Sequence, residues 1–184
     1  MSISANQAKL AMQQAQRIYS SEQVDNALDK MAAAITADTS TLNPVMLSVM
    51  NGGLIPMGML LPRLAFPLRI DYLHATRYRE RTFGTELQWK KHPEMSLEGE
   101  TVIVVDDILD EGYTLEAIVA HCREAGAKEV LSAVLIEKDH SRGTLFKADY
   151  VGLKAPDLYL FGYGMDYKGY WRNAAGIYAI SDNE

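Results

Sequence analysis

Hydrophobic residues are spaced in two ways along this chain, and each spacing predicts a kind of element. After Ser20, apolar residues recur every three or four positions: Val24, Leu28, Met31 and Ile35. That spacing predicts a helix, and Ser20 with Gln23 forms the capping box that would begin it. The preceding residues 6–19 also have a helical pattern, so we expect the chain to begin with helices.

The second spacing consists of short continuous apolar runs, which predict buried strands. These runs are residues 45–50, 68–73, 101–105 and 129–136, with shorter candidates at 149–153, 158–164 and 176–180. Segments 55–64 and 114–126 lie between runs and suit helices, the second ended by Gly126. Strands that alternate with helices predict an α/β fold with a parallel sheet and helices on both faces.

Residues 74–99 interrupt this alternation with a polar segment that includes the basic stretch "TRYRER". The segment is too long for a plain connection between two elements of a compact domain. We expect a long flexible lid loop or a protruding hairpin.

Composition narrows the class of protein. The 184 residues suit one domain. The net charge of -6 argues against broad nucleic-acid binding, and no apolar run is long enough to span a membrane. A single cysteine, Cys122, fits a reducing cytoplasm, and the four histidines lack metal-ligand spacing, so we expect no structural metal.

Unusual chemistry gathers where three of the predicted strands end. Asn51-Gly52-Gly53 follows the first run, Asp106-Asp107 follows the third, and Lys138 follows the fourth. The carboxyl ends of parallel strands lie along one edge of the sheet, where α/β proteins bind ligands. We therefore expect these side chains to lie close together.

The segment "VIVVDDILDEGYTL" (102–115) combines acidic residues with a glycine before a helix. Unpaired N–H groups at the helix start, beside Gly112 and the Thr114 hydroxyl, suit a phosphate. The aspartates would repel a phosphate, so they should face ribose hydroxyls or magnesium. A sugar phosphate satisfies both requirements.

Two other interpretations remain open on the residues alone. Asp106 and Asp107 could end a strand while Asp110 caps a helix, which is common for acidic residues. An acidic pair of the response-regulator kind is a third possibility, although such chains begin with a strand and this one is expected to begin with a helix.

The segment resembles the phosphoribosyl pyrophosphate (PRPP) motif of type I phosphoribosyltransferases. Three further stretches are similar to the hypoxanthine-guanine branch of that family: "VMNGG", "LIEK" and "PDLYLFGYGMDYKGYWRN". The four occur in the family's order, and the resemblance covers roughly residues 20 to 182. It implies a purine salvage enzyme that transfers phosphoribose from PRPP to hypoxanthine or guanine.

The resemblance assigns the PRPP site to residues 106–114. It implies that Asp106 and Asp107 hold the ribose hydroxyls, and that Asp110 acts as general base near purine N7. The 5'-phosphate would bind the backbone from Asp110 through Glu111, Gly112 and Tyr113 to Thr114, together with the Thr114 hydroxyl. Ile108 and Leu109 complete the implied PRPP-binding set.

The same resemblance assigns the purine, pyrophosphate and Mg²⁺ sites. For the purine it implies a 6-oxo contact by Lys138, stacking by Tyr159 and contacts from Leu160 and Asp166. For pyrophosphate it implies Asn51, Gly52, Gly53, Tyr78 and Arg172, with a cis peptide between Met50 and Asn51. Asp166 and Asp106 are the implied Mg²⁺ ligands. Asn51 stands where many relatives have lysine, and Arg77 where they have a small hydroxyl residue.

The family's layout implies one phosphoribosyltransferase domain over residues 1–184. Its core would span about 40–150, a small hood would come from about 1–40 and 151–184, and the lid would be about 74–99. The resemblance also implies a homo-oligomer, a dimer or tetramer. Alternatives are a xanthine or pyrimidine transferase, or a regulator of the same fold that senses PRPP or nucleotide.

Overall fold

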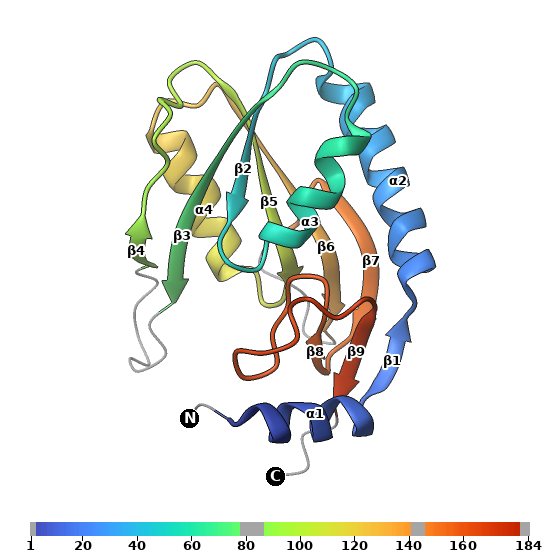
Figure 1. The fold of residues 1–184 in the computed structure, drawn as a ribbon. Helices are drawn as coiled ribbons and strands as arrows, with labels where there is room; N and C mark the ends of the chain where they lie inside the picture. The colour runs from blue at the N-terminus through green and yellow to red at the C-terminus, as the bar shows by residue number, and fades with distance from the viewer. Residues whose placement is uncertain (1–2, 78–86, 141–145, 181–184) are drawn as a thin grey trace.

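The computed structural model describes residues 3–77, 87–140 and 146–180. Its main feature is a six-stranded sheet in the order β4-β3-β2-β5-β6-β7 (Figure 1). The strands are β2 (Val45–Val49), β3 (Arg69–Arg77), β4 (Leu87–Lys91), β5 (Thr101–Leu109), β6 (Glu129–Asp139) and β7 (Tyr150–Pro156). All neighbours are parallel except β3 and β4. The predicted α/β fold with a mainly parallel sheet is confirmed.

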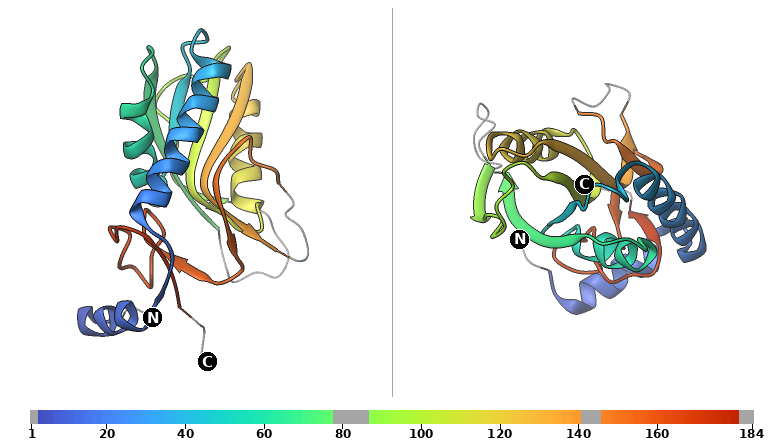
Figure 2. Two further views of the ribbon diagram at one scale, coloured as in Figure 1. Left: turned by 90° about the vertical axis from the view of Figure 1, so that its right-hand side faces the viewer. Right: turned by 90° about the horizontal axis from the view of Figure 1, so that it is seen from above.

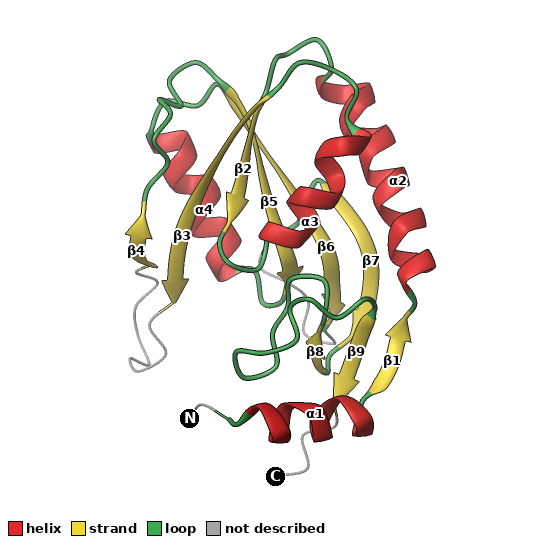
Figure 3. Ribbon diagram, viewed as in Figure 1, coloured by secondary structure: helices red, strands yellow, loops and turns green. Residues whose placement is uncertain are grey.

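Helices cover both faces of this sheet (Figures 2 and 3). α2 (Ser21–Thr39) and α3 (Leu54–Leu60), followed by a 3-10 turn at Leu61–Arg63, lie on one face, and α4 (Tyr113–Glu124) lies on the other. Neighbouring residues of β2 serve the two faces in turn: Met46 packs with α2 and α3, and Leu47 packs with α4. Burial on both faces explains why these strands are continuous apolar runs.

The second helix begins as the sequence predicts. The Ser20 side chain accepts from the Gln23 backbone, and the Gln23 side chain accepts from the Ser20 backbone. Its apolar residues at helical spacing are all buried: Val24, Leu28, Met31 and Ile35.

A smaller antiparallel sheet, ordered β1-β9-β8, lies beyond the carboxyl ends of the core strands. It combines β1 (Gln16–Tyr19) with β8 (Tyr159–Phe161) and β9 (Ile177–Ile180), so both ends of the chain build this hood. Helix α1 (Ala5–Gln14) lies across it. The sequence-based helix over 6–19 is therefore wrong for residues 16–19, which pair with β9 instead.

Two elements near the expected boundaries of the hood pack with each other in the core. α2 packs against β7, and both belong to the core layers. The strands of the hood sheet come from residues 16–19, 159–161 and 177–180, and the predicted bounds of core and hood stay a prediction.

The ends of the polar segment 74–99 form a hairpin. β3 continues to Arg77 and pairs antiparallel with β4. Tyr78 and the rest of 78–86 lie outside the described residues, so the expected contact of Tyr78 with pyrophosphate has no structural counterpart here. None of the helices in the described part of the chain is long and apolar enough to cross a membrane.

Candidate active site

One cavity lies where the carboxyl ends of β2, β5 and β6 face the loop between β8 and β9 (residues 162–176, the hood loop), and its volume is about 710 Å³. It collects twelve residues that the sequence had assigned to separate motifs. These residues are Asn51, Gly52, Asp106, Asp107, Ile108, Asp110, Thr114, Lys138, Tyr159, Leu160, Asp166 and Arg172. The parallel register of the strands is what brings the motifs together, because it aligns their carboxyl ends.

The acidic pair at the end of β5 is poorly solvated. The Asp107 backbone N–H donates to Asp106 Oδ1 over 2.9 Å, and the Asp107 side chain is only 10% exposed. Burial raises the pKa of Asp106 well above its usual range, and the charge on Asp107 raises it further. Burial also raises the pKa of Asp107, with Asp106 and Arg172 acting in the opposite direction. The site therefore favours a partner that offsets negative charge.

The loop after β2 approaches this pair closely. The Met50–Asn51 peptide is cis, as the sequence-based assignment expects. A Cβ on Gly52 would collide with the Asp107 carboxylate, and a Cβ on Gly164 would collide with the Gly52 carbonyl. Two glycines from distant segments thus allow the loop, the acidic pair and the hood to meet.

Arg172 joins the hood loop to the acidic pair. Its Nη2 donates to Asp166 Oδ1 and its Nη1 to the Gly164 carbonyl, each over 2.5 Å. Its Nη1 is also 3.9 Å from Asp107 Oδ2. The Asp166 carboxylate accepts a second bond from the Gly169 N–H over 2.7 Å. The guanidinium is consequently fixed over the cavity with Asp166 beside it.

The expected phosphate loop ends at the start of α4. Gly112 occupies the N-cap position with φ +94°, a conformation that favours glycine. A Cβ there would also press on Phe146. Thr114, in the first turn, lines the cavity. The helix start thus presents backbone N–H groups and a hydroxyl at the cavity wall, the groups that bind anions.

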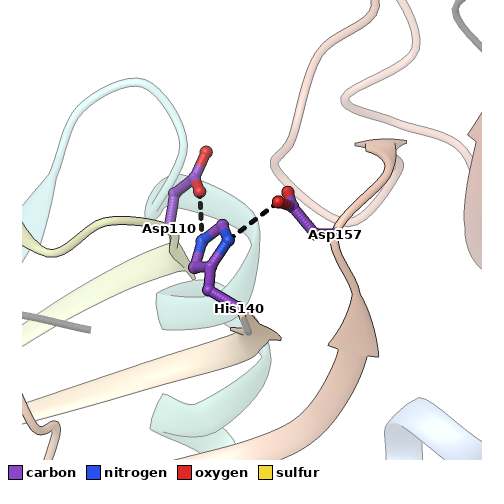
Figure 4. Close-up of side chains that lie close together, drawn as sticks. All are labelled: Asp110, His140 and Asp157. Atoms are coloured by element: carbon purple, nitrogen blue, oxygen red, sulfur yellow. Dashed lines mark hydrogen bonds and ion pairs between the residues drawn. The ribbon is translucent and has the colours of Figure 1, made fainter. Parts of the chain in front are cut away.

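At the other end of the cavity, Asp110 belongs to a ring of charged side chains (Figure 4). Lys138 Nζ lies 3.2 Å from Asp110 Oδ2 and 3.3 Å from Asp157 Oδ1. His140 lies between the same two carboxylates, 2.6 Å from Asp110 Oδ1 and 2.9 Å from Asp157 Oδ2. The hydrogen bond from His140, with Lys138 beside it, lowers the pKa of Asp157.

Some residues of the predicted set do not line the cavity among those described. Leu109 is a core residue packed with α4, and Gly53 lies under the loop, where a Cβ would meet the Val105 and Val49 carbonyls. Glu111, Gly112 and Tyr113 belong to the loop and helix start but are not lining residues. The motif implies contacts from the backbone of this loop, and these contacts stay a prediction.

Sequence reasoning missed other residues that the fold brings to the site. His74, within β3, and Lys90, near the end of the antiparallel β4, line the cavity. Burial, together with the Lys90 charge, lowers the pKa of His74. The basic character of segment 74–99 was the available signal for Lys90. For His140 there was no such signal, because it lies outside the four stretches that resemble the family. Asp157 lies in the last of these stretches, but no role was assigned to it.

Comparison with known proteins places the chain in a family. The phosphoribosyl transferase domain model matches residues 14–168. A hypoxanthine-guanine phosphoribosyltransferase of Staphylococcus epidermidis is 32% identical over 85% of this chain and 88% of its own length. The Bacillus subtilis enzyme of the same name is 29% identical over 85% and 87%.

A solved structure, a hypoxanthine phosphoribosyltransferase from Staphylococcus aureus, superposes with a TM-score of 0.85. It is 28% identical and covers 90% of this chain and 91% of its own. The aligned strand ends, the acidic pair beneath the hood and these matches agree, and the chain belongs to the phosphoribosyltransferase family, in its hypoxanthine-guanine branch.

Proposed function

We propose that this protein transfers the 5-phosphoribosyl group of PRPP to hypoxanthine or guanine, forming IMP or GMP and releasing pyrophosphate. The observation that carries the proposal is the single cavity in which the acidic pair, the start of α4, Lys138 and Tyr159 meet. Each of these features suits a different part of the two substrates.

The phosphoribosyl moiety fits the β5–α4 side. Asp106 and Asp107 are acceptors for the two ribose hydroxyls, which are donors. The loop from Asp110 to Thr114 accepts the 5'-phosphate on backbone N–H groups and the Thr114 hydroxyl. Hydroxyls on the acidic side and phosphate at the helix start avoid repulsion between phosphate and carboxylates.

The purine fits between Lys138 and Tyr159. Lys138 donates to the 6-oxo group, which adenine lacks, and Tyr159 stacks on the ring while Leu160 lies beside it. Purine N9 attacks the anomeric carbon of PRPP while the bond from that carbon to pyrophosphate breaks. The purine loses a proton in this step, and Asp110, placed near N7, accepts it.

Pyrophosphate leaves on the side of Asn51, Gly52 and Arg172. The Asn51 side chain carries no charge, so the cationic contribution comes from Arg172 and from the Lys90 ammonium at the cavity wall. Tyr78 and the lid segment would exclude water from the reacting sugar, since an oxocarbenium-like centre otherwise reacts with water.

The chain's own residues fit a magnesium ion. Among the described residues, the guanidinium that pairs with the acidic pair is that of Arg172, 3.9 Å from Asp107, and burial raises both carboxyl pKa values, so a divalent cation would add compensating charge. Asp106 and Asp166 would hold it with oxygen ligands, which magnesium prefers. When bound, it offsets the charge that develops on the leaving pyrophosphate.

A pyrophosphate-release assay with PRPP, magnesium and five bases tests the proposal. We expect turnover with hypoxanthine or guanine, and none with adenine or uracil. Turnover with xanthine alone would favour the alternative of a xanthine transferase, since contacts at the purine 2-position decide that choice. Activity confined to adenine or uracil would contradict the role of Lys138.

A regulator with the same fold is the second alternative. It would bind PRPP or nucleotide without turnover and would bind RNA or DNA with a salt-dependent affinity. The net charge of -6 favours the enzyme over a regulator that binds nucleic acid.

We also expect a homo-oligomer, because Ile70 and Tyr72 of β3 have large hydrophobic side chains and are 57% and 41% exposed. Light scattering would measure the mass of the assembly.

A further inference from the structure

His140 is buried at the purine end of the cavity yet belongs to none of the family motifs. Only 6% of its side chain is exposed, and it follows β6 two residues after Lys138. Its Nδ1 contacts Asp157 Oδ2 over 2.9 Å. A carboxylate can only accept a hydrogen bond, so Nδ1 carries a proton and donates a hydrogen bond to Asp157.

The other ring nitrogen faces the proposed general base. His140 Nε2 lies 2.6 Å from Asp110 Oδ1 without the alignment of a hydrogen bond. A bare ring nitrogen and a carboxylate oxygen are both acceptors and would repel at this distance. A proton on His140 Nε2 would make the contact attractive. The geometry therefore suits an imidazolium that lies between the Asp110 and Asp157 carboxylates.

The ring of charges separates the two oxygens of Asp110. Oδ1 faces His140, whereas Oδ2 accepts from Lys138 over 3.2 Å. Under the proposed function, Lys138 turns to the purine 6-oxo group when the base binds, and Asp110 loses that partner. Oδ2 then becomes available to purine N7 while Oδ1 keeps its contact with His140.

We propose that His140 is a positioning residue for Asp110: anchored by Asp157, it holds the carboxylate with Oδ2 toward purine N7 after Lys138 has moved to the substrate. The role rests on the proposed function. It explains why His140 contacts the Asp110 carboxylate through one ring nitrogen and the exposed Asp157 carboxylate through the other.

A metal ion is the competing use of the same atoms. Asp110, His140 and Asp157 lie close enough to share one ion. The Lys138 ammonium, however, contacts both carboxylates at 3.2 and 3.3 Å, and its positive charge opposes a cation there. Two carboxylate charges are balanced by Lys138 and an imidazolium, whereas Lys138 and a divalent ion together would exceed them, so these contacts favour a protonated histidine over a metal.

Three substitutions separate positioning from packing. In His140→Gln the amide reaches the place of Nε2 and can donate to Asp110, whereas in His140→Asn the amide reaches only the place of Nδ1. We expect kcat to fall about tenfold in His140→Ala and His140→Asn but only about threefold in His140→Gln, with KM for PRPP unchanged. His92→Gln is the matched control, because His92 contacts Trp89 and His121 away from the cavity.

A double-mutant cycle asks whether His140 acts through Asp110. If it does, adding His140→Ala to Asp110→Asn lowers kcat no further than Asp110→Asn alone. Multiplied losses would overturn the proposal, as would an unchanged kcat in His140→Ala or a His140→Gln enzyme as slow as His140→Ala.

Imidazole ¹⁵N spectra of the free protein test the contact independently of turnover. We expect the Nε2 resonance of His140 to shift in Asp110→Asn and the Nδ1 resonance to shift in Asp157→Asn. An Nε2 resonance that is unmoved by Asp110→Asn would overturn the pairing, whatever the enzyme does. Failure of the proposed function would instead appear as wild-type protein that turns over no base.

Discussion

The two ends of the cavity hold carboxylates from one nine-residue strand and its following loop, in opposite environments. Asp106 and Asp107 are crowded together against protein, and burial raises the pKa of both. Asp110, a few residues later, has a side chain that is 52% exposed and two basic neighbours, Lys138 and His140. The first site has one guanidinium, that of Arg172, at 3.9 Å from Asp107, whereas at the second site two basic side chains contact the carboxylate directly.

This difference assigns the two ends different tasks. The carboxylates of Asp106 and Asp107 gain most from a ligand that brings hydroxyl donors or a cation, so their end of the cavity suits the binding of PRPP. A carboxylate held in a fixed orientation by basic groups suits proton transfer. Changes at Asp110 should therefore lower turnover, whereas changes around Asp107 should alter PRPP binding and stability.

The largest expected effect comes from removing the base at the purine end. In Asp110→Asn, kcat should fall about 100-fold or more, because the amide cannot accept the purine proton. PRPP binding, measured by calorimetry, should change little. A variant that keeps its turnover would exclude Asp110 from proton transfer and would erase the contrast between the two ends.

Crowding at the acidic end is tested next. Gly52→Ala places a methyl group on the Asp107 carboxylate, so KM for PRPP should rise about tenfold through displacement of the pair and loop. Gly58→Ala in α3 is the control, since its Cβ would have no atom within 4 Å. That variant should gain about 0.5–1 kcal/mol of unfolding free energy and keep its kinetics.

The pH dependence of stability sharpens the comparison further. A carboxyl whose pKa is raised on folding binds more protons in the folded state, so its contribution falls as pH rises through the folded pKa. The amide of Asp106→Asn does not ionise, so this variant does not lose stability at this position as the pH rises. In the free protein, its melting temperature should exceed that of wild type above pH 7, and the difference should shrink toward pH 4. A constant difference across this range would mean that burial does not govern the pair.

The smallest effect concerns the hood that covers both ends. The Trp171 indole donates to the Ala8 carbonyl of α1 over 2.6 Å, and Arg172 is the next residue. Trp171→Phe should lower the unfolding free energy by about 0.5–1.5 kcal/mol and raise KM for PRPP slightly. An unchanged melting temperature would show that α1 does not anchor the hood loop.

Local patterns predicted the core and one half of the site. The capping box of α2 and the apolar runs of the sheet depend on neighbouring residues, so they could be read directly. The acidic motif also lies within one segment. Residues 16–19 could not be assigned correctly, because a four-residue strand depends on pairing with β9, far away in sequence.

By itself, the sequence determined the α/β class and the order of the motifs, and it predicted the acidic and phosphate-binding groups, since each of these is encoded within a short stretch. Only the tertiary structure decided that Asp106 and Asp107 are crowded together against protein while Asp110 faces His140 and Lys138. Burial and charge contacts are set by segments that are distant in the chain, and Asp157 reaches His140 only because β6 and β7 pair side by side.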